Sequence, residues 1–128
     1  MKTILIVDDE KNLLKLYEKE FSEEGYRVIT ANSGSEALQK IEKDSFDLVV
    51  LDIRMPDLNG VETLKKIMES TSKVPVILNS AYTSYRDNFL TWAAEAYVVK
   101  SSDLTELKAK AKEVLEKRAQ VQRAQHPN

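Results

Sequence analysis

The chain has 128 residues, of which 42% are hydrophobic and 31% are charged, a balance typical of one soluble globular domain with a single core. Its net charge of −2 is too small to indicate binding to nucleic acid or to a membrane surface through bulk charge. There is no cysteine, which excludes disulfides and thiolate chemistry, and the apolar run behind Met1 is too short for a signal peptide or a membrane span. We therefore expect a cytoplasmic location.

Short apolar runs alternate with segments of helical spacing along the chain. The five runs are 4–7, 26–30, 48–51, 74–78 and 96–99, and the helical apolar stripes fall in 13–21, 37–41, 61–68 and 104–115. Aromatic residues at helical spacing favour a further helix in 83–94. Most of the runs are continuous, as in strands buried on both faces. The pattern predicts an α/β fold of the doubly wound (βα)5 type, in which a five-stranded parallel sheet lies between two layers of helices. We expect one domain over 1–118 and a tail over 119–128 that extends the last helix and then frays.

Local signals place several of the helix ends. Ser33 and Glu36 have the spacing of a capping box, which predicts that the second helix begins near Gly34. Gly25 is expected to end the first helix, and Gly60 to begin the third.

Charged residues close three of the apolar runs. Asp8 and Asp9 follow the first run, Asp52 follows the third, and Lys100 follows the fifth. Because the carboxyl ends of parallel strands meet at one edge of a sheet, these side chains are expected to converge there. Three carboxylates in one crevice repel one another and call for a cation such as Mg²⁺, which prefers oxygen ligands. The lysine could hold a phosphoryl oxygen. The sequence therefore predicts a magnesium-dependent phosphoryl-transfer site.

The most specific motif surrounds Asp52. Residues 52–60 read Asp-x-x-Met-Pro-x-x-x-Gly, and Asp8-Asp9, residues 80–82 (Ser-Ala-Tyr) and Lys100 follow at matching places. In this combination the chain resembles the receiver domain of two-component response regulators, from about residue 2 to about residue 117. The resemblance implies a stand-alone receiver with flavodoxin-like strand order 2-1-3-4-5.

The resemblance also implies roles for the acidic residues. Asp52 would accept the phosphoryl group, since a carboxylate can attack phosphorus and form an acyl phosphate. Asp8, Asp9 and Asp52 would hold Mg²⁺ together with the backbone carbonyl of Arg54. Apart from this resemblance, acids at such positions also favour a helix N-terminus through the helix dipole.

Three further residues would read the phosphoryl group. Ser80 would donate a hydrogen bond to it, Lys100 would pair with Asp52 before phosphorylation and with the phosphoryl group afterwards, and Tyr97 would be the aromatic switch that moves inward. One departure is Ser101, which stands where the family usually has a proline after a cis bond. A cis bond before a residue other than proline costs roughly 3 kcal/mol, so a trans bond is the alternative.

The resemblance implies a signalling role. The phosphoryl donor would be a sensor histidine kinase or a histidine phosphotransfer protein in a phosphorelay. The output would be a protein target that binds the face formed by the fourth helix, fifth strand and fifth helix (83–94, 96–99 and 104–115). We expect no nucleic-acid or membrane partner. We also expect no enzymatic activity beyond catalysis of the chain's own phosphorylation and dephosphorylation.

Two other functions remain open at this level. A small phosphatase or phosphotransferase of the haloacid-dehalogenase type would also use an aspartyl phosphate, but it usually has a second acid where this chain has Arg54. A flavodoxin-like binding module would need a phosphate-binding loop rich in serine, threonine and glycine after Val7, which the sequence lacks.

Overall fold

The computed structural model describes residues 1–52, 60–70, 74–80 and 94–125. The strands are β1 (Thr3–Val7), β2 (Arg27–Ala31), β3 (Leu48–Leu51), β4 (Val76–Ser80) and β5 (Ala96–Val99). The helices are α1 (Lys11–Glu23), α2 (Gly34–Lys43), α3 (Gly60–Glu69) and α4 (Thr105–Gln125). The helix expected in 83–94 lies outside the described residues.

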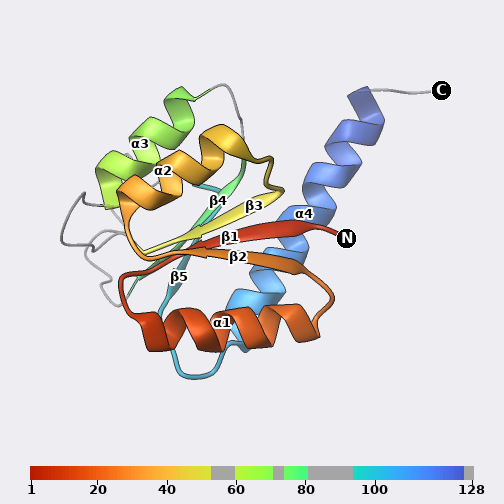
Figure 1. Cartoon of the computed structure of the whole chain (residues 1–128). Helices are drawn as coiled ribbons and strands as arrows, with labels where there is room; N and C mark the ends of the chain where they lie inside the picture. The colour runs from red at the N-terminus through yellow and green to blue at the C-terminus, as the bar shows by residue number, and fades with distance from the viewer. Residues whose placement is uncertain (53–59, 71–73, 81–93, 126–128) are drawn as a thin grey trace.

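The five strands form one parallel sheet in the order β2-β1-β3-β4-β5. Helices α1 and α4 cover one face of the sheet, and α2 and α3 cover the other (Figure 1). The predicted fold class and strand order are therefore confirmed.

The sheet separates two hydrophobic cores. In β1, Ile4 and Ile6 belong to the core beneath α1 and α4, whereas Leu5 and Val7 belong to the core beneath α2 and α3. Successive side chains of a strand point to opposite faces, so a strand buried on both faces must be apolar throughout. This is why the runs in the sequence are continuous rather than alternating.

Two strands are displaced along the chain from their predicted positions. The second begins at Arg27 rather than residue 26, and the fourth spans Val76–Ser80 rather than 74–78. Pro75 has no N–H to donate, and its carbonyl accepts from Val49 N–H at 3.0 Å just before the paired segment begins. Ser80 is consequently the last residue of β4, not a residue that follows the strand.

The predicted helix ends agree with the structure. Ser33 Oγ accepts a hydrogen bond from Glu36 N–H at 3.1 Å, and α2 begins at Gly34. The Glu36 carboxylate reaches back to Asn32 N–H at 3.2 Å, one residue earlier than in a regular capping box. Gly25 follows α1 with a φ of +94°, a conformation that favours glycine.

The last helix is the longest described element. In Figure 1 the end of α4 nearest the C-terminus extends past the sheet. No helix in the described ranges has the length and the apolar character that crossing a membrane requires.

Candidate functional site

The strand ends bring four predicted residues to one edge of the sheet. Backbone hydrogen bonds continue the pairing one residue beyond the strands: Asp8 N–H donates to Ala31 O at 3.1 Å, and Asp52 N–H donates to Val7 O at 3.0 Å. Between β5 and β4, Lys100 N–H likewise donates to Ser80 O at 2.8 Å. The main chain of Asp8, Asp52 and Lys100 is thus fixed by the neighbouring strand.

Three carboxylates gather at this edge. Asp8, Asp9 and Asp52 each offer an oxygen, and these oxygens lie within 4.8 Å of one another. Asp8 is 1% exposed and Asp52 is 5% exposed, whereas Asp9 lies at the surface. Two buried negative charges at such short range are unfavourable unless cations compensate them.

Lys100 provides part of that compensation. Its Nζ lies 2.9 Å from Asp52 Oδ2, to which it donates a hydrogen bond, and 2.7 Å from Asp8 Oδ2. Burial by itself lowers the pKa of Lys100, but the contacts with Asp8 and Asp52 outweigh burial and raise this pKa above its ordinary value. The lysine therefore stays protonated as the counter-ion of both carboxylates.

One oxygen of Asp8 remains incompletely satisfied. Asp8 Oδ1 accepts a hydrogen bond from Glu10 N–H at 2.9 Å. Asp8 Oδ2 is fully buried and accepts no hydrogen bond of ordinary geometry within the described chain, although the Lys100 ammonium is at ion-pair distance. An acceptor buried in this way is costly for stability. A divalent cation among Asp8, Asp9 and Asp52 would satisfy it, so the donor set fits Mg²⁺.

Ser80 lies at this edge, whereas Tyr97 lies in β5 three residues before Lys100. Ser80 is fully buried at the end of β4, and Tyr97 is half-buried in β5, packed against the core beneath α2 and α3. Both make interactions within the protein. The Lys100–Ser101 bond is trans. The predicted ligand Arg54 lies outside the described residues.

A polar pair beside the site is not predicted from the sequence. Asn79 Nδ2 donates a hydrogen bond to the Tyr17 hydroxyl at 3.1 Å, and both residues are buried. In the sequence, Tyr17 falls within the apolar stripe 13–21. The available signal was an asparagine directly after the apolar run 74–78, because a buried amide needs a hydrogen-bond partner.

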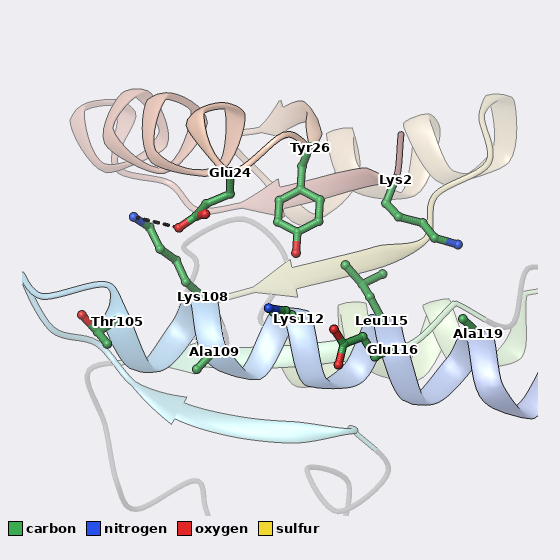
Figure 2. Close-up of a pocket in the computed structure, with 10 residues that line it drawn as sticks. All are labelled: Lys2, Glu24, Tyr26, Thr105, Lys108, Ala109, Lys112, Leu115, Glu116 and Ala119. Carbon is green, nitrogen blue, oxygen red and sulfur yellow. Dashed lines mark ion pairs between the residues drawn. The ribbon is translucent and has the colours of Figure 1, made fainter.

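A groove lies elsewhere on the molecule. It has a volume of about 690 Å³ and lies between α4 and the residues just before β1 and β2, and its lining includes Lys2, Tyr26, Lys108 and Lys112. Figure 2 shows the Tyr26 hydroxyl directed toward α4, and Lys108 pairing with Glu24 at 3.6 Å. None of the three clustered aspartates lines this groove. The candidate site is the edge of the sheet where Asp8, Asp9, Asp52 and Lys100 converge, which we call the acidic edge, and not the groove.

Comparison with known proteins identifies the family. Residues 4–112 match the response regulator receiver domain. The chain is 36% identical over 122 residues to the response regulator ArlR of Staphylococcus aureus, covering 94% of this chain and 55% of that protein. It thus spans about half the length of this curated relative.

Solved structures agree with this match. The response regulator TrrA of Thermotoga maritima, in a complex with Mg²⁺ and BeF, is 46% identical with a TM-score of 0.85, over 89% of this chain and 99% of that one. TrrA in complex with the histidine kinase ThkA gives 46% identity and a TM-score of 0.84, over 90% of this chain and 99% of that one. A CheY-like receiver domain protein of Methanospirillum hungatei is 33% identical with a TM-score of 0.88, over 94% and 98% of the two chains. With this fold and this acidic edge, the chain belongs to the family of response regulator receiver domains.

Proposed function

We propose that Asp52 accepts a phosphoryl group from a phosphohistidine of a sensor histidine kinase or a histidine phosphotransfer protein. The observation that carries this proposal is the buried Asp52 carboxylate, which directly follows β3 and shares the Lys100 ammonium with Asp8 in a receiver fold. The family match favours this function over a phosphatase or a flavin-binding module. The complex of TrrA with the kinase ThkA supports the choice of donor.

The reaction requires little beyond positioning and charge. A carboxylate oxygen of Asp52 attacks phosphorus, the bond from phosphorus to the donor imidazole nitrogen breaks, and an acyl phosphate forms. Asp8, Asp9 and Asp52 would hold Mg²⁺, with the carbonyl of Arg54 as a further ligand, and when bound this ion supplies positive charge beside the phosphoryl oxygens. The Mg²⁺–BeF complex of TrrA supports this assignment.

Lys100 and Ser80 would read the product. Lys100 bridges two carboxylates before the reaction, so phosphorylation of Asp52 offers its ammonium a new anionic partner. Ser80 lies at the end of β4, and its carbonyl accepts from the Lys100 amide. Movement of Ser80, Lys100 and Tyr97 would then bias an equilibrium between inactive and active conformations. The output would be binding of a protein target to the face around β5 and α4, in the cytoplasm and without further enzymatic activity.

The test is phosphorylation by acetyl phosphate with Mg²⁺, followed by intact-protein mass spectrometry. We expect one added phosphoryl group in the wild type and in Asp44→Ala, a control at an exposed aspartate just after α2. Asp52→Ala is expected to remain unlabelled. Labelling of the Asp52→Ala protein, or full-rate labelling of the wild type in excess chelator, would falsify the assignment.

A further inference from the structure

The Tyr17–Asn79 hydrogen bond joins α1 to the end of β4. The two residues are 62 positions apart, and Tyr17 is 2% exposed and Asn79 is 3% exposed. Tyr17 packs in the core beneath α1 and α4 with apolar residues that include Ile77, which is on the same face of β4 as Asn79. An apolar side chain at position 79 would suit this core without the desolvation cost of an amide. Core packing alone therefore does not account for the pair.

The pair lies next to the residues that would handle the phosphoryl group. Asn79 directly precedes Ser80, and in the sheet register these two residues pair with Val98 and Val99 of β5. The Ser80 carbonyl in turn accepts from Lys100 N–H at 2.8 Å. Fixing the Asn79 side chain therefore fixes the stretch of backbone on which both Ser80 and Lys100 depend.

The Tyr17 hydroxyl also lies within the electric field of the acidic edge. Burial raises the pKa of Tyr17 most, and the Asn79 hydrogen bond and the Lys100 charge lower it, while the charges of Asp8 and Asp52 raise it. Since the hydroxyl oxygen accepts from Asn79, its own proton is left to donate. The pair is thus coupled to the site both through the backbone of β4 and through charge.

We infer that Tyr17 is a positioning residue of the phosphorylation site. Acting through Asn79, it holds the end of β4 so that Ser80 and Lys100 keep their places around Asp52. The inference rests on the proposed role of Asp52 as phosphoacceptor and adds α1 to the elements that set its reactivity.

The kinetic test compares Tyr17→Phe, Asn79→Leu, the double variant and Tyr26→Phe at saturating Mg²⁺ and acetyl phosphate. Tyr26→Phe is the matched control because it removes a half-buried tyrosine hydroxyl that lines the groove and not the acidic edge. We expect Tyr17→Phe and Asn79→Leu each to lower the maximal phosphorylation rate about three- to tenfold, the range that corresponds to one net hydrogen bond. The double variant should be no slower than the slower single variant, because both substitutions break one contact. A Tyr17→Phe rate within about twofold of the wild type, or losses that multiply in the double variant, would overturn the inference.

A second measurement does not depend on phosphorylation. Amide hydrogen exchange is followed at Lys100, whose N–H donates to Ser80 O, and at Asp52, whose N–H donates to Val7 O. Tyr17→Phe should speed exchange at Lys100 about three- to tenfold relative to Asp52. A uniform loss of stability would accelerate both amides alike, and an unchanged ratio contradicts the inference. A wild type that is not phosphorylated on Asp52 would refute the proposed function, whereas this ratio would still decide whether Tyr17 positions Lys100.

Discussion

Lys100 is the residue on which the balance of charge at the site depends. Its side chain is 14% exposed and pairs with two carboxylates that follow different strands. A Mg²⁺ ion bound by Asp8, Asp9 and Asp52 would draw on the negative charge of the Asp8 carboxylate, whose Oδ2 lies 2.7 Å from Lys100 Nζ. The ammonium and the metal ion would therefore compete for the same negative charge.

Removing the ammonium should strengthen metal binding. We expect Lys100→Ala to lower the dissociation constant for Mg²⁺ about three- to tenfold, the range of roughly 1 kcal/mol for losing one competing charge. Isothermal titration calorimetry measures this constant, with Lys112→Ala on the exposed side of α4 as the control. An affinity for Mg²⁺ that is unchanged or weaker in Lys100→Ala would show that the two cations do not compete.

The same residue determines a dependence of stability on pH. Because the folded protein raises the pKa of Lys100 above its ordinary 10.5, the stabilisation from its ion pairs is complete below about pH 10 and is lost as the pH rises through the folded value. We expect Lys100→Ala to lower the free energy of unfolding by roughly 3 kcal/mol in metal-free buffer at neutral pH. Urea unfolding measured at about pH 7, 9 and 11 should show this difference constant at the first two values and smaller at the third. A difference that already shrinks between the first two values would contradict the raised pKa of Lys100.

At the scale of single elements, helix ends are set by short-range contacts. Ser33 caps α2 through its hydroxyl, and Gly25 lets the chain leave α1 with a positive φ. Neither residue contributes to the acidic edge. Substitutions here should change the stability of the protein and leave its chemistry intact.

The cap of α2 can be tested by Ser33→Ala. Loss of the hydrogen bond to Glu36 N–H should lower the free energy of unfolding by about 1 kcal/mol. Urea denaturation measures the change, and Ser45→Ala, at an exposed position between α2 and β3, should have an effect below about 0.5 kcal/mol. Equal effects of the two substitutions would exclude a capping role for Ser33.

A substitution in the turn after α1 can measure the energetic cost of an unfavourable backbone conformation separately from any steric clash. A Cβ added at Gly25 would meet no atom within 4 Å, so Gly25→Ala introduces no clash. The φ of +94° is nevertheless unfavourable for alanine, and the free energy of unfolding should fall by about 1–2 kcal/mol. A smaller loss in the same urea experiment, below about 0.5 kcal/mol, would mean that the turn relaxes to another conformation.

At the scale of the whole molecule, repulsion among the carboxylates of the acidic edge disfavours the folded state, and a bound cation would relieve it. Asp8 and Asp9 follow β1 and Asp52 follows β3, so the unfolded chain does not bring the three carboxylates together. Binding of Mg²⁺ should therefore stabilise the folded state by about 1.4 kcal/mol at a concentration ten times the dissociation constant.

Thermal unfolding with and without Mg²⁺ measures this effect. Asp8→Asn should abolish the Mg²⁺-dependent rise in Tm and should raise the Tm of the metal-free protein, because one buried charge of the crowded pair is removed. Asp44→Asn, remote from the edge, should keep the full response to Mg²⁺. A Tm that responds equally to Mg²⁺ in wild type and Asp8→Asn would place the cation elsewhere.

By itself, the sequence determined the strands, their parallel arrangement and the edge at which the charges meet. These follow from short-range patterns, since continuous apolar runs indicate burial on both faces, and the charges that follow three of the runs indicate the edge. The convergence of Asp8, Asp9, Asp52 and Lys100 was predictable for this reason. Their roles in metal binding and phosphoryl transfer stay predictions.

Only the tertiary structure decided how these groups share their contacts. It showed that Lys100 bridges Asp8 as well as Asp52, that Ser80 belongs to β4, and that Tyr17 holds Asn79. Each of these depends on side chains or strands that are far apart in the sequence and meet only when the sheet and its helices pack. Periodicity and local propensity carry no information about such pairs, because they describe neighbours along the chain and not neighbours in space.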